Sequence, residues 1–184
     1  KDGQPFRRRN YRPALVAVAV LAAMTAVAWG VVLTRPVTIA DTATCNAPPT
    51  ATDAAAPKLG QRVSGSVLID VAPAKLAETK IRVLNASGMG GQAGEVAGAL
   101  RDLGFAAPTA ANDPIYAGTR LACQGQIRFG ESGKANAATA WLVAPCVELY
   151  RDDREDDSVD LVIGTDFTSL SNSDDIAAVL SGLR

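Results

Sequence analysis

The sequence predicts an α/β (α+β) protein: a small extracytoplasmic domain with strand-helix units on a mixed sheet, preceded by one transmembrane helix. Residues 81–105 combine an apolar strand, a glycine-rich turn and an amphipathic helix. Residues 127–144 repeat this order more weakly. Residues 14–33 form an apolar run of about 20 residues without a charge, enough to cross a hydrocarbon core of roughly 30 Å.

The N-terminal region is expected to anchor the chain with its N-terminus in the cytoplasm. Basic residues crowd the start of the apolar run, whereas only Arg35 follows it, and positive flanks stay on the cytoplasmic side. A cleaved signal peptide is the alternative, because Ala26-Val27-Ala28 has the form of a cleavage site. Apolar residues continue to Leu33, which favours an uncleaved anchor. Residues 1–13 are then a cytoplasmic basic tail and residues 14–33 the transmembrane helix.

Residues 34–62 read as an extracytoplasmic linker and residues 63–184 as the folded domain. The linker is rich in Thr, Ala and Pro, so little of it can be buried and an extended conformation is expected. The chain is 48% hydrophobic but only 5% aromatic, so small aliphatic side chains must build the core.

The central element is predicted to begin with a strand over Ile81–Asn85, where apolar side chains alternate. Glycines at positions 88, 90 and 91 permit a sharp reversal with positive φ. A helix follows and ends at Gly104, with Phe105 making the closing apolar contact. Its buried stripe comprises Ala93, Val96, Ala97, Leu100 and Leu103.

This turn is the candidate binding site of the sequence. Gly88 to Ala93 fits the G-x-G-x-x-G/A pattern of dinucleotide-binding turns. The acidic residue expected about 20 positions later would be Asp113, but that residue stands in an Asn-Asp-Pro turn. A structural role is therefore favoured over nucleotide binding. The residues that would bind a ligand here are Asn85, Ser87, Gly88 and Gly90.

The remaining elements follow from local patterns. Residues 106–116 hold two prolines and are expected to be a loop. A polar hairpin turn at residues 151–157 is expected to join the last two strands. The expected strands are Leu121–Phe129, Val147–Tyr150 and Val159–Ile163, and Val67–Val71 is expected to be an edge strand or an extended lead-in. One helical turn is expected over Pro73–Glu78, with helices over Lys134–Ala144 and Ile176–Leu183.

Charge and composition exclude several function classes. Residues 1–35 hold six basic residues and one acidic residue, so the remainder holds twelve basic and eighteen acidic residues and is unsuited to nucleic acid. Histidine is absent, which removes the commonest general base and metal ligand. The carboxylates of residues 152–157 lack the spacing of a calcium loop and are expected to be solvated. We therefore expect no enzyme, no metal and no cofactor.

The three cysteines lie outside the membrane in this topology, where disulfides persist. Cys123 and Cys146 begin two strands on either side of a helical crossover, so parallel neighbours would bring them together. A Cys123–Cys146 disulfide is the first expectation. Cys45 would then be free or bonded to another molecule. In the alternative, Cys45 pairs with one of the other two and fastens the linker to the domain.

The chain resembles the LytR C-terminal domain family of actinobacterial envelope proteins. The matching residues are Ile81–Asn85, Ser87-Gly88, the helix around Ala93 to Leu103, Gly104-Phe105 and the closing strand from Val159 to Phe167. Ala86 departs from the glycine that many relatives carry after the Asn. The resemblance implies a role in maintaining the cell envelope.

The leading hypothesis is a non-enzymatic membrane protein whose periplasmic domain acts by binding, with a membrane protein or an envelope polymer as its partner. The alternative is a single-pass accessory subunit of a large membrane complex, such as a respiratory supercomplex or a lipid exporter. Small residues along the anchor, including Ala19, Ala26 and Gly30, would permit close helix contact there. Nucleotide binding at Gly88–Gly91 is the third hypothesis.

Overall fold

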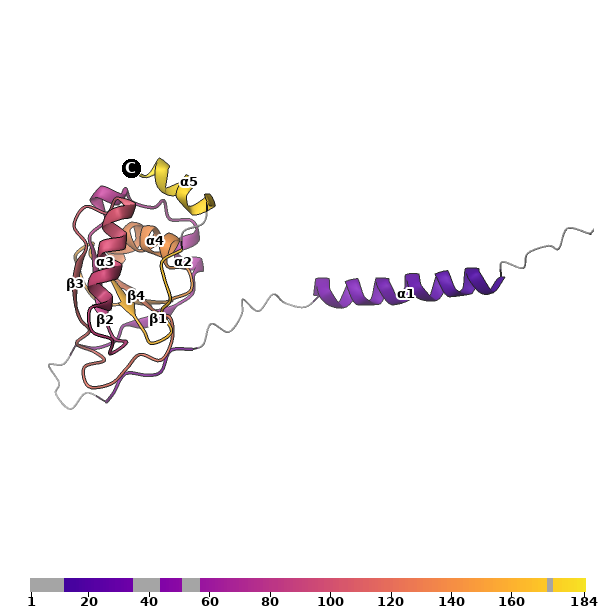
Figure 1. Ribbon diagram of the computed structural model, residues 1–184, viewed down its shortest axis with the longest axis horizontal. Helices are drawn as coiled ribbons and strands as arrows, with labels where there is room; N and C mark the ends of the chain where they lie inside the picture. The colour runs from indigo at the N-terminus through magenta and orange to yellow at the C-terminus, as the bar shows by residue number, and fades with distance from the viewer. Residues whose placement is uncertain (1–11, 35–43, 51–56, 172–173) are drawn as a thin grey trace, which may run out of the picture. The chain divides into compact units, whose positions relative to one another are not determined.

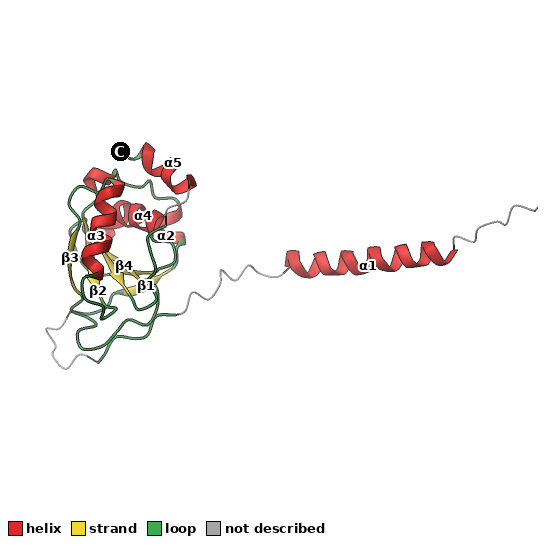
Figure 2. Ribbon diagram, viewed as in Figure 1, coloured by secondary structure: helices red, strands yellow, loops and turns green. Residues whose placement is uncertain are grey.

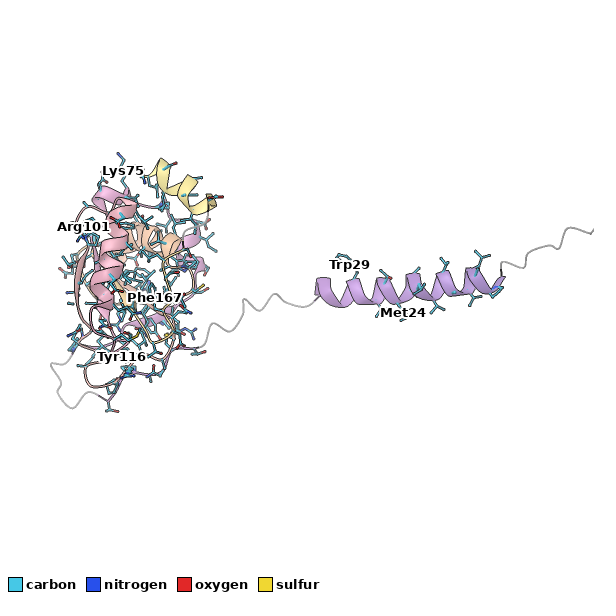
Figure 3. All side chains as sticks on the ribbon, viewed as in Figure 1. Met24, Trp29, Lys75, Arg101, Tyr116 and Phe167 are labelled. Carbon is cyan, nitrogen blue, oxygen red and sulfur yellow. A yellow bond between two sulfur atoms is a disulfide. The ribbon has the colours of Figure 1, made fainter. Side chains whose placement is uncertain are left out.

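The computed structural model describes residues 12–34, 44–50, 57–171 and 174–184. The chain forms two compact units, Lys1–Ala40 and Asp41–Arg184. The first contains the 23-residue helix α1 (Arg12–Thr34), whose described apolar side chains, such as Met24 and Trp29, are exposed (Figure 3). Within the described residues, no helix combines the length and the hydropathy that crossing a membrane requires.

The second unit is built on a mixed sheet of six strands in the order β1-β5-β4-β6-β2-β3. Strands β1, β2, β3 and β4 are labelled in Figure 1. Two strand-helix-strand units provide most of it: β2-α3-β3 and β4-α4-β5, each with parallel neighbouring strands. Strand β6 lies between them, parallel to β2 and antiparallel to β4. The strands are β1 (Gln61–Val63), β2 (Ile81–Asn85), β3 (Thr109–Asn112), β4 (Gly125–Phe129), β5 (Glu148–Arg151) and β6 (Val159–Ile163).

Helices cover one face of this sheet (Figure 2). Val83, Ile127 and Leu161 are fully buried in the main core, together with Ala97 and Leu100 of α3. This packing confirms the mixed α/β fold and both predicted strand-helix units. The helical elements are α2 (Ser66–Ile69), η1 (Leu76–Glu78), α3 (Gln92–Leu103), η2 (Glu131–Gly133), α4 (Lys134–Val143) and α5 (Asp174–Gly182).

The opposite face carries a smaller apolar cluster and the charged side chains of the sheet. The cluster gathers Leu84 of β2 and Val162 of β6 with Tyr116, Leu121 and Cys123 from the long connection between β3 and β4. This connection therefore lies over one part of the helix-free face. The other part is open, and it holds the site described below.

Two predictions of local structure were wrong. Residues 66–69 form α2 instead of a strand, because Gly65 lies against the Trp141 ring of α4 and Leu68 is buried there. Residues 109–112 form β3 instead of a loop. All four side chains of β3 are exposed, so the strand shows no apolar pattern in the sequence and is held by its parallel pairing with β2.

The predicted hairpin between the last two strands was also wrong. Strands β5 and β6 are not neighbours, because β4 lies between them. The intervening residues pass over the end of β4, where a side chain at Gly130 would overlap the Arg154 carbonyl oxygen. Long-range pairing with β4 thus replaces the local pairing that the short connection indicated.

Candidate functional site

The predicted binding turn is closed by its own hydrogen bonds. The Asn85 side-chain amide donates to the Met89 carbonyl oxygen (2.7 Å), and its oxygen accepts from the Ser87 backbone N–H (3.0 Å). The Ser87 hydroxyl donates to the Gln92 side-chain oxygen (2.6 Å) and accepts from the Met89 N–H (3.0 Å). The structure brings Asn85 and Ser87 together, but their polar groups serve the turn.

The glycines of this turn differ in their roles. Gly88 has φ of 78° and Gly91 has φ of 84°, a region that favours glycine. A side chain at Gly88 would also meet the Arg120 side chain. Gly90 has no positive φ and faces open space, so the reversal does not depend on it. Ligand binding at Asn85, Ser87, Gly88 and Gly90 stays a prediction.

The expected Cys123–Cys146 disulfide was wrong: Cys45 bonds to Cys123, with 4.9 Å between their Cα atoms, and Cys146 is free and exposed. Strands β4 and β5 are parallel neighbours as expected, but β4 begins only at Gly125. Cys123 precedes it, in the connection that lies over the helix-free face, and is buried there. The alternative pairing, which fastens the linker to the domain, is the one observed.

Cys45 is thus bonded to the connection between β3 and β4, and Asn46 adds polar contacts to the covalent one. The Asn46 side chain donates to the Arg120 carbonyl oxygen (3.1 Å) and accepts from the Ala122 N–H (2.6 Å). Its backbone carbonyl oxygen accepts from the Tyr116 hydroxyl (2.7 Å). The Cys45 N–H donates to Glu148 of β5 (3.3 Å). Part of the segment that composition assigned to the linker is therefore part of the folded unit.

A buried ion pair lies beneath this segment. The Arg128 guanidinium donates to both carboxylate oxygens of Asp113, at 2.7 and 3.1 Å. It also donates to the Gln126 side-chain oxygen at 2.8 Å and lies 5.9 Å from the centre of the Tyr116 ring. The two charged side chains are only 3% and 0% exposed, so the pair replaces the hydration that both groups lose.

The open part of the helix-free face forms a charged groove with a volume of about 1620 Å³. It is hollowed between the starts of β2 and β6, the end of β5 and the connection from β5 to β6. Five basic and six acidic residues contribute to its walls. The charged groove is lined by residues 58–61, 77–82, 106, 107, 109, 151–154, 156–158 and 160.

An alternating chain of charges forms the centre of the charged groove. Arg82 donates to both oxygens of Asp160, at 2.8 and 3.0 Å. Arg154 donates to Asp160 at 2.8 Å and to Asp152 at 2.6 Å. Burial acts to raise the pKa of Asp160, but the hydrogen bonds from Arg82 and Arg154 outweigh it, so this pKa lies below its ordinary value.

The remaining charges of the groove are more exposed. Lys80 pairs with Asp157 at 2.9 Å, and hydrogen bonding to this carboxylate raises the lysine pKa. The side chains of Lys80 and Arg82 are 68% and 53% exposed, so both present N–H donors to solvent. A ligand here would meet exposed donors next to carboxylate acceptors.

Sequence reasoning missed the charged groove, although a signal was visible. Arg82, Arg128 and Asp160 each stand inside an otherwise apolar or buried strand. The register aligns them in one cross-strand row, with Arg128 opposite Asp160 and Asp160 opposite Arg82. Charged residues at one level of three central strands indicate a polar sheet face. Across the described residues, no group of three or more Cys, Asp or Glu side chains is arranged to hold a metal ion.

Fold and site together define a class: a small mixed-sheet α/β domain with helices on one face and a charged groove on the other. Residues 78–167 match the family model described as LytR cell envelope-related transcriptional attenuator, which confirms the predicted resemblance. The chain belongs to the family of the cell envelope integrity protein Cei of Mycobacterium tuberculosis (strain ATCC 25618 / H37Rv). That relative is 64% identical over 184 residues, which are 100% of this chain and 85% of the relative.

A solved structure has the same fold. It is the crystal structure of the soluble domain of a conserved hypothetical secreted protein from Mycobacterium marinum. The two chains are 70% identical and superpose with a TM-score of 0.68, over 70% of this chain and 86% of the other. The compact unit described here is thus similar to a domain that crystallises by itself.

Proposed function

We propose that this protein is a non-enzymatic envelope protein, anchored in the cytoplasmic membrane through the apolar run of residues 14–33, whose extracytoplasmic domain supports envelope integrity by binding. The observation that carries the proposal is the charged groove on the helix-free face of the sheet. The name of the Mycobacterium tuberculosis relative supports the envelope role. That the protein binds its partner through the charged groove is our own proposal.

The groove suits a long polar ligand. Its volume of about 1620 Å³ exceeds the roughly 300–1,000 Å³ of pockets that enclose small molecules. Exposed lysine and arginine donors stand beside carboxylate acceptors. A polymer that carries both hydrogen-bond donors and acceptors would therefore find partners along the length of the groove. We therefore favour a segment of an envelope polymer as the ligand, with a membrane protein as the other candidate partner.

The proposed location rests on the disulfide and on α1. The Cys45–Cys123 bond suits the oxidising side of the membrane. The exposed side chains of α1 include Leu15, Val18, Leu21, Met24 and Trp29, an apolar surface suited to lipid or to neighbouring helices. This surface also fits the alternative of an accessory subunit. For nucleotide binding we find no support at Gly88–Gly91, because the polar side chains of that turn bond one another.

Retention of the full-length protein by isolated cell walls tests the proposal. The groove variant Lys58→Gln/Lys80→Gln removes two exposed cations, of which Lys80 is ion-paired. Lys134 of the control Lys75→Gln/Lys134→Gln pairs with Glu131, whereas Lys75 has no ion pair among the described residues. Both lysines lie outside the groove lining. We expect the groove variant to lose retention and the control to keep it.

Vesicles of envelope lipids serve as the second probe in the same assay. Equal retention of both variants by the walls would contradict a role of the groove. Binding to vesicles alone, with the same dependence on Lys58 and Lys80, would replace the polymer by a lipid as the ligand.

A further inference from the structure

Strand β3 (Thr109–Asn112) is an unprotected edge of the sheet. Among the strands that the structure describes, it pairs with β2 alone, and all four of its side chains are exposed. Proteins usually guard such edges with very short strands, charged side chains, prolines or bulges, and β3, which consists of Thr, Ala, Ala and Asn, has only its short length. The opposite edge, β1, is shorter and carries Arg62, which pairs with Glu148. The two edges therefore differ in how well they are guarded.

Helix α3 presents two glycines beside this edge. Gly94 and Gly98 lie inside the helix, where glycine destabilises relative to alanine. The domain itself does not require them, because neither has a positive φ and a Cβ at either would meet nothing within 4 Å. Arg101, which is labelled in Figure 3, follows Gly98 by three residues and so lies on the same side of the helix. Its side chain donates to the carbonyl oxygen of Pro108, the residue directly before β3. The glycines thus face the β3 side of the helix.

We propose that a second copy of this chain docks here, with the two β3 strands paired antiparallel about a two-fold axis. The sheets of the two copies would then be continuous, and the two α3 helices would lie side by side on one face. This inference is independent of the charged groove and of its ligand.

The dimensions of the two elements fit this arrangement. Helix α3 packs over both β2 and β3, so the two α3 axes would be two strand spacings apart, about 9.6 Å. Packed helices lie roughly 8–10 Å apart. A contact at this distance is eased by glycines, which let two helix backbones approach.

The axial positions also agree. The centre of β3 lies about 8 Å beyond Pro108 along the strand. Helix α3 runs antiparallel to the strands, so its residue numbers decrease along the direction of β3. At about 1.5 Å per helical residue, this distance is about five residues, which places the centre of β3 close to position 96 of the helix. The two-fold axis would therefore pass near Gly94 and Gly98. With the axis at Gly98, two residues from position 96, Glu95 of one copy would face Arg101 of the other.

Sedimentation velocity of residues 44–184 measures this association without the anchor. A close relative of this unit crystallises as a separate soluble domain, so the unit is suited to the experiment. We expect a concentration-dependent dimer that Gly98→Leu weakens by at least about tenfold. The same variant should keep or raise the melting temperature, because its side chain has space and favours the helix. Gly182→Leu, at another helical glycine with open space, is the control.

A cross-link gives the second readout. In a Cys146→Ser background, Gly98→Cys lies near the proposed axis and should give an oxidised dimer, whereas Gly182→Cys should not. A domain that stays monomeric at its highest soluble concentration would overturn the proposal. A dimer that Gly98→Leu leaves unchanged would overturn it as well, and pairing of β3 with another protein would then be the remaining explanation for the open edge.

Discussion

At the residue scale, buried charges organise the helix-free face of the sheet. Asp113 and Arg128 are paired with almost no exposure, and Asp160 accepts from two arginines. Such groups are tolerated inside a protein only when every partner is present. Their contribution is therefore best measured by removing one partner at a time.

Removal of one partner of the buried pair should be costly. Arg128→Met leaves the Asp113 carboxylate buried without its cation, and we expect a loss of about 3–5 kcal/mol in the free energy of unfolding. Urea denaturation of the domain measures it. The double variant Arg128→Met/Asp113→Leu should recover a large part of the loss. A single variant as stable as the parent would show that the pair does not hold this face together.

Asp160 should make stability depend on pH. Its pKa is lower in the folded chain than the ordinary value of 3.8, so its stabilising effect is complete above that value. The effect is lost as the pH falls through the lowered pKa. Thermal unfolding between pH 2 and pH 7, roughly the range over which carboxylates titrate, should therefore show a steeper acid loss for the parent than for Asp160→Asn. Parallel profiles would contradict this role.

At the element scale, the strand-helix units were predictable and their long-range arrangement was not. The strand over Ile81–Asn85 and the helix over Lys134–Val143 follow from apolar periodicity, which the sequence displays directly. Strand β3 has no such pattern, because neither of its faces is buried. The insertion of β4 between β5 and β6 depends on contacts between distant residues, which local patterns cannot reveal.

The same distinction holds for the site. The turn at Asn85–Gly88 was visible as a motif, yet its polar groups are used within the turn. The charged groove combines residues from four separate segments, 58–61, 77–82, 106–109 and 151–160, which no motif unites. The disulfide was misassigned because Cys123 lies before β4, in the connection over the helix-free face, where it meets Cys45.

The Cys45–Cys123 disulfide fastens the N-terminal segment to the sheet, and its removal should be felt by the whole domain. The bond joins residues 78 positions apart, and the chain-entropy model then gives about 4.5 kcal/mol. We expect Cys45→Ser to lower the melting temperature and to expose residues 44–50 to protease. Cys146→Ser, which removes the free thiol, is the control. A Cys45→Ser variant that melts with the parent would contradict this role.

At the scale of the whole molecule, the proposed topology places the domain outside the cytoplasmic membrane. The exposed thiol of Cys146 reports on this location, because Cys45 and Cys123 are oxidised. In intact cells with a permeabilised outer envelope, a membrane-impermeant maleimide should label the parent and not Cys146→Ser. Labelling only after lysis would place the domain in the cytoplasm and overturn the proposed topology.

The central claim is that the charged groove is the surface through which the protein binds its envelope partner. Site-specific photocrosslinking in living cells tests it most directly, with the photoreactive residue placed at Lys58 or Lys80 inside the groove and at Lys75 or Lys134 outside it. We predict that the two groove positions form the same high-mass adduct and that the two outer positions do not. Adducts of equal yield from all four positions, or from the outer positions alone, would contradict the claim.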